Sequence, residues 1–401
     1  RSTLFPYTTL FRSTNLLAFI TSHAPSLTHF RGQLIKMLCD KGIQVFTFAP
    51  NFDDETRMAV QSLGAIPIDC SMSRAGMNPF VDILNTWQLA RLLKRIHPDI
   101  VLNYFIKPVI FGSLAAKWAG VPYRIAMIEG LGFIFTPGPT GFSLARRVLK
   151  RLVMLLYKLG LSCADKVIFL NPDDQNEFIA AHLLPPSKTF LLGGIGVDLN
   201  KWPFTPPVVE SLTFLMVARL LREKGVEDYV NAARIVKKIN PQIRFILLGD
   251  LDDNPGAITR SEVQAWHDEG IIEWQGHVPV QPWLVQTSVF VLPSYREGVP
   301  VSTQEALAVG RPVITTDVPG CRQTVADGVN GFLVPVHSPE LLAEKMITFM
   351  QHPELITSMG LASRQLALEH YDICKVNQRL IQLICLKTSK CGQCPPSVAA
   401  S

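Results

Sequence analysis

Short apolar runs of strand length alternate with longer amphipathic stretches through the first half of the chain. The longer stretches, such as residues 30–42 and 80–98, repeat their apolar residues at the three- and four-residue spacing of a helix. Strands that alternate with helices are joined by crossovers and form a parallel sheet covered on both faces. Five runs are predicted as strands: residues 15–21, 43–49, 99–105, 123–128 and 165–170.

The alternation stops at residues 191–211, where glycines and then prolines replace the periodic sequence, as in a linker between domains. The fold class predicted for the whole chain is therefore α/β, with two doubly wound, Rossmann-like parallel-sheet domains facing a cleft. Ligands of such sheets bind beyond the carboxyl ends of the strands. Six further runs are predicted as strands of the second domain: residues 212–218, 243–249, 271–274, 288–293, 312–316 and 331–335.

A chain of 401 residues is long enough for two domains of ordinary size. We expect residues 14–197 to form the first domain, residues 198–370 the second, and residues 371–386 a C-terminal helix that packs back towards the first. Residues 1–13 lack a starting Met and resemble translated sequencing adapter, and residues 387–401 continue the last helix poorly. Both ends are expected to be non-native or disordered.

Composition and charge indicate what kind of protein this is and which ligands it can bind. Hydrophobic residues make up 48% of the chain and charged residues 18%, which is typical of a folded globular protein. Residues 1–200 contain 20 Lys and Arg against 13 Asp and Glu, whereas the remainder contains 18 against 20. A basic half suits a nucleic acid, an anionic membrane surface or a phosphorylated substrate. No run of 18 uncharged apolar residues and no secretory signal occur, so the sequence predicts a cytoplasmic location.

The eight cysteines are scattered, mostly within apolar runs, so buried free thiols in a reducing compartment are expected. Only Cys391 and Cys394 have the spacing of a metal or redox pair. A lone pair at a chain end is a weak signal, and no metal site is predicted.

Residues 293–313 have the strongest chemical signal. A strand end is followed by a loop with Gly298 and a helix start near Val301, which directs backbone N–H groups and a positive dipole end towards the ligand edge. A phosphate would fit there, and Gly298 lets a ligand approach the backbone closely. Glu305 would repel a phosphate but can accept two sugar hydroxyls, unless it is an ordinary first-turn acid. Glu297 would face another part of the same ligand.

Two cations are predicted near this anion site. Arg219 and Lys224 follow another strand end, where a loop enters a helix, so both side chains can reach the ligand edge. Two cations, a helix terminus and an acid that binds hydroxyls suit a nucleoside diphosphate sugar. The simpler alternative is that Arg222, Glu223 and Lys224 form a solvated helix start.

Five motifs occur in order over residues 218–335: ARLLREKG, LLGD, GHV, LPSYREGVPVSTQEALAVGRPVITTDVPGC and DGVNGFLVP. Together they resemble the carboxyl-terminal domain of family 4 glycosyltransferases, which have the GT-B fold. In the first domain, THFRGQLIKML and IKPVIFGSLAAKWAGVPYRIAMIEGLGFIFT are similar to the bacterial branch that builds surface polysaccharides and glycan precursors on polyprenyl diphosphate. The resemblance covers residues 14–386.

The resemblance implies roles for individual residues. In the family, the cations matching Arg219 and Lys224 bind the donor diphosphate and stabilise its charge as the sugar leaves. The acid matching Glu297 holds hydroxyls of the donor sugar, and the acid matching Glu305 binds the ribose. The remaining matches face the phosphates (Gly298, Val299 and Val301) or hold the base (Gly249, Gly276, His277 and Val278). His277 is alternatively an ordinary loop histidine.

Family members retain the anomeric configuration by attack on the same face, in which the leaving phosphate takes the acceptor proton. No pair of glycosidase-type carboxylates is then required. Many relatives have a histidine at the end of the fifth strand, where this sequence has Glu129. Either Glu129 assists the acceptor hydroxyl or contacts an amide-bearing sugar, or the backbone of residues 130–132 positions the ligand and Glu129 is structural.

Residues 141–160 combine basic and apolar side chains, which suits a helix lying on an anionic bilayer. A helix packed on the core, with a solvated basic face, is the alternative, and a lipid-linked acceptor favours membrane contact. The side chains in question are Arg146, Arg147, Lys150, Arg151 and Lys158, with Leu149, Leu152, Val153, Leu155 and Leu156.

The sequence thus predicts a retaining hexosyltransferase at the inner face of the cytoplasmic membrane. It would move an N-acetylhexosamine from a UDP-linked donor to a polyprenyl-diphosphate-linked sugar, with no further cofactor and no nucleic acid partner. The uridine and the acetylated sugar follow from the branch and not from the residues. Alternatives are a nucleotide-sugar epimerase on the same fold and a non-catalytic nucleotide-sugar-binding module. An NAD-dependent oxidoreductase is disfavoured because residues 21–33 lack the glycine cluster of a dinucleotide turn.

Overall fold

The computed structural model confirms the alternation of strands and helices that the sequence predicts. By their internal contacts, the residues divide into two compact units. Unit 1 contains the described residues up to Met127, Leu159–Lys166 and those from Ile381 on, and unit 2 contains those of Ile128–Lys158 and Val167–Leu380. The domain limits expected from the sequence stay a prediction. The structure describes residues 15–72, 78–136, 141, 143–252, 254 and 256–385, so the termini expected to be non-native and the pair Cys391 and Cys394 lie outside these residues.

The first sheet has seven strands in the order β3-β2-β1-β4-β5-β6-β7, and its described pairs are parallel. The five runs predicted as strands are confirmed, but the two edge strands, β3 and β7, were not predicted. Both are short, and β3 contains a proline and has no buried residue, so neither gives a clear apolar run. The strands are β1 (Leu16–Ile20), β2 (Gln44–Ala49), β3 (Ile66–Asp69), β4 (Ile100–Tyr104), β5 (Tyr123–Ile128), β6 (Lys166–Phe169) and β7 (Thr189–Leu191).

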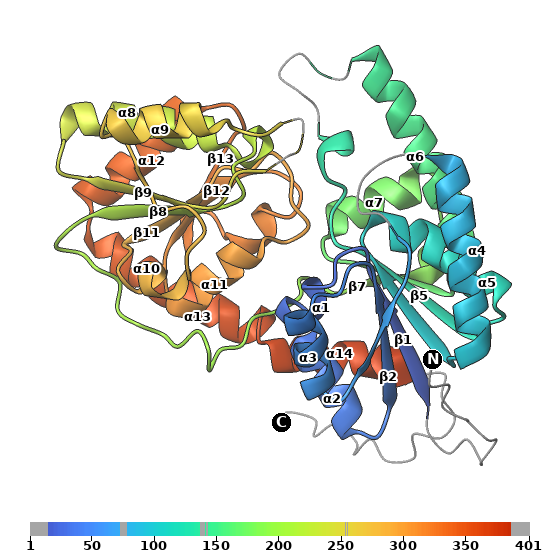
Figure 1. The fold of residues 1–401 in the computed structure, drawn as a ribbon. Helices are drawn as coiled ribbons and strands as arrows, with labels where there is room; N and C mark the ends of the chain where they lie inside the picture. Colours follow the sequence, from blue (N-terminus) through green and yellow to red (C-terminus); the bar gives the residue numbers. More distant parts are fainter. Residues whose placement is uncertain are drawn as a thin grey trace. The chain divides into compact units, whose positions relative to one another are not determined.

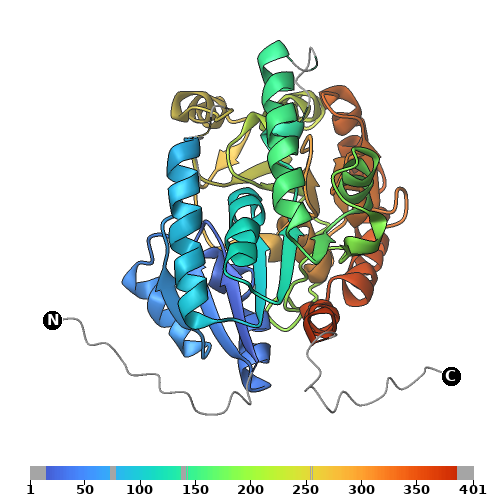
Figure 2. The same ribbon diagram turned by 90° about the vertical axis from the view of Figure 1, so that its right-hand side faces the viewer.

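Helices cover both faces of the unit 1 strands. Helices α2 and α3 lie on one face, and α4 and α5 lie side by side on the other (Figures 1 and 2). The helices of this part of the chain are α1 (Ser26–His29), α2 (Gly32–Asp40), α3 (Asp54–Ser62), α4 (Pro79–Ile96), α5 (Ser113–Trp118), α6 (Leu144–Ser162) and α7 (Pro172–Ala180), with a π-helix at Pro108–Gly112 and 3₁₀ turns at Phe133–Phe135 and Pro186–Lys188.

Helix α6 has one buried and one exposed face. Val153 and Tyr157 are buried, so the interpretation that grouped Val153 with lipid-facing residues is wrong. The exposed apolar residues recur every three or four positions and form one stripe: Leu144, Val148, Leu152, Leu155 and Leu159. None of the helices in the described part of the chain is both long enough and apolar enough to span a bilayer.

The second sheet has six strands in the order β10-β9-β8-β11-β12-β13, all parallel and all predicted from the sequence. Helices α8, α9 and α12 cover one face, and α10, α11 and α13 cover the other (Figure 1). The strands are β8 (Thr213–Val217), β9 (Arg244–Leu248), β10 (Glu273–Trp274), β11 (Val289–Leu292), β12 (Val313–Thr316) and β13 (Gly331–Val334).

The remaining helices belong to the same half of the chain. They are α8 (Val226–Ile239), α9 (Arg260–Asp268), α10 (Gln281–Val285), α11 (Val301–Val309), α12 (Pro339–Gln351), α13 (Glu354–His370) and α14 (Ile373–Cys385), with 3₁₀ turns at Arg222–Lys224 and Arg322–Thr324. Helix α14 lies in the stretch where a C-terminal helix was expected. Residues 192–212 contain no helix or strand, as expected for the predicted linker.

Most residues in the strands of the second sheet are apolar, because helices cover both faces. Phe214 on β8 stacks on Phe245 on β9 with ring centroids 5.2 Å apart. Tyr229 of α8 is fully buried, and its hydroxyl hydrogen-bonds the carbonyl oxygens of Phe214 and Ile246 at 2.9 and 3.1 Å. Burying each such ring contributes about 1.5–3 kcal/mol, and satisfying the Tyr229 hydroxyl avoids the cost of an unpaired buried donor.

The order of the second sheet reverses direction between β8 and β11, its two central strands. Their register pairs Val289 with Phe214 and Phe290 with Leu215, so both strands end at the same edge. Ligands of open parallel sheets bind at such a reversal, beyond the carboxyl ends of the strands. The segments that leave β8 and β11 carry Arg219, Lys224 and Glu297, so these predicted residues flank the expected ligand position.

Candidate active site

The loops after β8 and β11 bring Lys224 and Glu297 together. Lys224 ends the 3₁₀ turn before α8, and its Nζ lies 2.5 Å from Oε1 of Glu297. The two side chains are 17% and 14% exposed, so the ion pair is partly shielded from water. Gly225 makes this approach possible, because a Cβ there would lie 2.1 Å from the carbonyl oxygen of Pro293. The alternative of a fully solvated helix start therefore does not hold for Lys224.

Arg219, the other predicted cation, lies two residues beyond the end of β8. Its Nη1 is 2.7 Å from Oδ2 of Asp252, and its side chain is half exposed. An ion pair at such a position contributes little to stability, since water screens it. A bound diphosphate can therefore compete with Asp252 for this guanidinium.

Helix α11 begins at Val301, as predicted, and no side chain caps it. Pro300 occupies the N-cap position in an extended conformation, so the first-turn amides of this nine-residue helix are directed at the strand edge. The side chain of Val299 is buried and that of Val301 half buried, so the predicted contribution of both residues to a phosphate site would come from their backbone.

Three backbone segments meet without intervening side chains beside this helix start. A Cβ at Gly298 would lie 1.9 Å from the carbonyl oxygen of Glu129, and a Cβ at Gly320 would lie 2.3 Å from that of Glu297. The sequence interpretation attributed Gly298 to close approach of a ligand, but the structure gives a reason within the protein. Glu129 directly follows β5, as predicted, and its backbone lies against the segment that carries Glu297.

Glu305 is the fifth residue of α11 and is half buried. Burial raises the pKa of its carboxyl group from 4.5 to about 7, and nearby Lys201 only partly opposes this effect. No hydrogen bond from another described residue reaches this carboxyl group. Its oxygens are therefore available to ligand hydroxyls, as expected for a residue that binds a ribose.

The residues predicted to hold a base lie after β9 and β10. The amide of Gly249 donates to the carbonyl oxygen of Gly276 at 2.9 Å, so the structure joins these two loops. Trp274 was not singled out from the sequence, although its indole Nε1 donates to the Gly249 carbonyl at 3.0 Å. Beyond Gly276, His277 is exposed and Val278 half buried.

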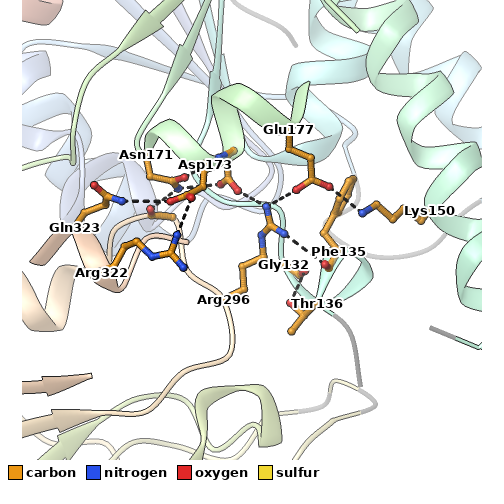
Figure 3. A network of polar contacts seen from close by, with 12 residues as sticks. Gly132, Phe135, Thr136, Lys150, Asn171, Asp173, Glu177, Arg296, Arg322 and Gln323 are labelled. Carbon is orange, nitrogen blue, oxygen red and sulfur yellow. Dashed lines mark hydrogen bonds and ion pairs between the residues drawn. The ribbon is translucent and has the colours of Figure 1, made fainter. Parts of the chain in front are cut away.

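A polar network that sequence reasoning missed surrounds Arg296, the residue before Glu297 (Figure 3). The Arg296 guanidinium pairs with Asp174, and its Nη2 lies 2.7 Å from Oε2 of Glu177. Glu177 also accepts from Lys150 of α6 at 2.8 Å. The available signal was the sequence NPDDQNE directly after β6, where Asn171 caps α7 and acids fill its first turns.

The two acids of this network have opposite pKa shifts. Burial raises the pKa of Asp174, and hydrogen bonds from Arg296 and Asn171 offset only part of that effect. Burial also opposes ionisation of Glu177, but hydrogen bonds from Lys150 and Arg296 and their positive charges outweigh it and hold its pKa below the ordinary value. Arg296 thus favours the charged form of both carboxylates, together with Asn171 at Asp174 and Lys150 at Glu177.

A second link joins α7 to the loop after β12. Arg322 places Nη1 2.9 Å from Oδ1 of Asp173 and Nε 2.7 Å from Oδ1 of Asp317. Gln323 donates to the other oxygen of Asp173 at 3.3 Å (Figure 3). The first turn of α7 is therefore held by two loops that leave the second sheet.

Two family models match the chain. Residues 17–171 match "Glycosyl transferase 4-like" and residues 211–352 match "Glycosyl transferases group 1". The chain is 31% identical over 383 residues to an N,N'-diacetylbacillosaminyl-diphospho-undecaprenol α-1,3-N-acetylgalactosaminyltransferase of Campylobacter jejuni, covering 92% of this chain and 97% of that protein. It is 27% identical over 273 residues to a UDP-Gal:α-D-GlcNAc-diphosphoundecaprenol α-1,3-galactosyltransferase of Escherichia coli, covering 64% of this chain and 67% of that protein.

Among solved structures, the sucrose-phosphate synthase of Thermosynechococcus elongatus superimposes with a TM-score of 0.75 at 18% identity, covering 92% of this chain and 98% of that one. At this identity the likeness shows the fold, and the predicted GT-B class is confirmed. The match to the Campylobacter protein extends over almost the whole of both sequences. The chain therefore belongs to the glycosyltransferases that combine a family 4-like domain with a group 1 domain, and it is an enzyme of the hexosyltransferase class.

Proposed function

We propose that this glycosyltransferase moves an N-acetylhexosamine from a UDP-linked donor to a sugar carried on polyprenyl diphosphate, with retention at the anomeric carbon. The observation that carries the proposal is the placement of Lys224, Glu297 and the uncapped start of α11 at one strand edge. The names of the two relatives supply the substrate classes, because both act on undecaprenyl-diphosphate-linked sugars.

The proposed reaction uses the site as follows. Lys224, Arg219 and the first-turn amides of α11 hold the donor diphosphate and stabilise the charge that grows on it as the bond from C1 to the phosphate oxygen breaks. Glu297, held beside Lys224, orients hydroxyls of the departing sugar. A new bond forms from C1 to the acceptor oxygen on the same face, and the acceptor proton passes to the leaving phosphate. Glu305 binds the ribose and takes no proton from the acceptor.

A pocket in unit 1 suits the acceptor sugar. It has a volume of about 840 Å³ and lies beyond the carboxyl ends of β1, β2 and β3, where an α/β sheet binds its ligands. Helix α4 contributes Val81 and Asn85 to the lining. The same helix exposes five large apolar side chains to which a polyprenyl chain can bind: Phe80, Val81, Ile83, Leu84 and Trp87.

Membrane contact is assigned to the exposed face of α6. Its apolar stripe is flanked by the exposed cations Arg147, Arg151 and Lys158, and this combination suits a helix lying at an anionic lipid surface. With a lipid-linked acceptor, the enzyme would work at the inner face of the cytoplasmic membrane. The expectation that no nucleic acid binds belongs to the same proposal, because the basic residues then serve lipid and diphosphate.

Liposome flotation with and without anionic lipid tests this contact. Leu155→Glu should abolish flotation, whereas Leu361→Glu on α13 should not, although both leucines are 55% exposed. Equal flotation of the two variants, or flotation that does not depend on anionic lipid, would exclude α6 as the membrane face.

The main test of function is a panel of nucleotide sugars offered with undecaprenyl-diphosphate-linked N-acetylhexosamine, with the anomeric configuration of the product read by NMR. We expect transfer from a UDP-N-acetylhexosamine with retention. Incubation with donor alone separates the alternatives, since an epimerised nucleotide sugar indicates an epimerase, and nucleotide binding without turnover indicates a binding module. We also propose that no metal or organic cofactor is required, so a chelator should leave the rate of transfer unchanged.

A further inference from the structure

Three contacts fix the backbone around Glu297. The Glu297 amide donates to the carbonyl oxygen of Pro319 at 3.1 Å, and the carbonyl oxygen of Gly298 accepts from Nδ2 of Asn171 at 2.6 Å. On the other side of Glu297, the guanidinium of Arg296 binds Asp174 and Glu177. Two of the three contacts come from α7 or its N-cap, so α7 helps to hold the segment that carries Glu297.

The Arg296 cluster is buried to a degree that stability alone does not explain. The side chains of Arg296 and Asp174 are 10% and 1% exposed. Removing such charges from water costs free energy that their attraction often fails to recover, so apolar side chains of similar size would stabilise the fold at least as well. What a planar guanidinium between two carboxylates supplies is a defined orientation.

The same cluster continues outward to α6. Glu177 binds Arg296 through one carboxylate oxygen and Lys150 through the other (Figure 3). Lys150 also lies 4.9 Å from the ring centroid of Phe135, whose carbonyl oxygen faces Arg296. Glu177 is thus oriented from two sides, and this restricts the position in which it can hold Arg296.

We propose that Arg296 is a positioning residue for sugar transfer, which acts by holding Glu297 in the orientation required by the departing sugar. The proposal rests on the role given above to Glu297, because Arg296 has no direct part in the chemistry. A residue that positions another should affect turnover more than donor binding, since misplacing a group by about 1 Å can cost up to about 100-fold in rate.

The first experiment compares Arg296→Met with Arg124→Met, a matched control. Arg124 is also a shielded arginine, 14% exposed, with Nη2 3.0 Å from Oδ1 of Asp165, but it lies near the amino end of β5 and away from the ligand edge. Active sites are counted by calorimetric binding of UDP. We expect Arg296→Met to lower kcat per UDP site by about tenfold or more, with less than about threefold change in donor KM. Arg124→Met should lower Tm to a similar extent and leave kcat within about twofold.

The second experiment asks whether Arg296 acts through Glu297. In a Glu297→Gln background, adding Arg296→Met should lower kcat by less than about threefold, because the group that it orients is already lost. A full tenfold loss in that background, or an unchanged kcat in the single variant, would overturn the proposal while leaving the proposed function intact. Absence of transfer by the wild type with every donor would overturn both.

Two milder variants cover the case in which Arg296→Met fails to fold. Glu177→Gln keeps the shape of a half-buried side chain but removes one of the two charges that hold Arg296, so kcat should fall by about threefold. In the Glu297→Gln background the same change should lower kcat by less than that. Arg296→Lys keeps the charge but cannot reach two carboxylates in a fork, so its kcat should lie between those of the wild type and Arg296→Met. A Glu177→Gln enzyme with wild-type kcat would count against the proposal.

Discussion

Glu305→Gln should stabilise the unliganded protein above neutral pH and weaken donor binding at the same time. The folded state raises the pKa of this carboxyl group from 4.5 to about 7 by burial. Folded protein therefore binds the Glu305 proton more tightly than unfolded protein does. The resulting stabilisation is fully present below pH 4.5 and is lost as the pH rises through 7.

The magnitude follows from the size of the pKa change. Each unit of pKa corresponds to about 1.4 kcal/mol, so ionised Glu305 costs at most about 3.5 kcal/mol of stability at pH 8.5. Glutamine has the same shape and does not ionise, so the variant escapes this cost. About 2–4 °C in Tm is expected per kcal/mol for a domain of 150–250 residues, so Glu305→Gln should melt several degrees higher than the wild type at pH 8.5. At pH 5 the two proteins should melt at nearly the same temperature.

The assay is thermal unfolding of wild type and variant between pH 5 and 8.5, with UDP binding measured in parallel. Glu262→Gln is the control, because hydrogen bonds from Thr259 and Arg222 lower the pKa of Glu262 to about 2. The stabilisation that wild-type Glu262 supplies is present above pH 4.5 and is lost only as the pH falls towards 2. Glu262→Gln should therefore lower Tm by the same amount at every pH between 5 and 8.5. A Tm difference between Glu305→Gln and wild type that is the same at pH 5 and pH 8.5 would refute the reasoning.

Three further predictions concern residues of the candidate site. Gly298→Ala should abolish transfer and lower Tm, because its Cβ would meet the Glu129 carbonyl oxygen at 1.9 Å. Gly276→Ala has open space around the new Cβ but a φ of 70°, so it should lower the free energy of unfolding by only about 1–2 kcal/mol. Thermal unfolding of both variants checks this difference. Lys224→Met should lower kcat by about 100-fold, because it removes the cation beside Glu297 that would stabilise the leaving group. A kcat within threefold of wild type would exclude Lys224 from that role. Glu129→Gln should slow transfer if this carboxylate moves a proton, and full activity would eliminate that role.

Much of the fold could be predicted because buried parallel strands are continuous apolar runs. All six strands of the second sheet were found in this way, and so was the start of α11 at Val301, because the glycine and proline before it mark a loop. Edge strands such as β3 are exposed and short, and they lack that signal. The side of α6 that Val153 occupies depends on what packs against the helix, and the sequence of α6 alone does not contain that information.

The residues of the candidate site that directly follow the ends of strands could be predicted from the sequence. Arg219, Lys224 and Glu297 all leave β8 or β11, and the parallel topology brings such residues to one edge. The contacts of Arg296 could not be predicted in this way, because its partners Asp174 and Glu177 are more than 100 positions away in the sequence and no local spacing links them. Trp274 was overlooked because its indole binds a backbone carbonyl, an acceptor that every residue has.

The backbone contacts at Gly298 and Gly320 also limit how the enzyme can be redesigned. Because the carbonyl oxygens of Glu129 and Glu297 occupy the places where side chains would stand, mutagenesis libraries that vary either glycine would consist mostly of misfolded members. Insertions in these loops would meet the same obstacle. A search for variants that accept a different donor sugar should therefore leave loop length and both glycines unchanged and randomise the side chain at Glu129.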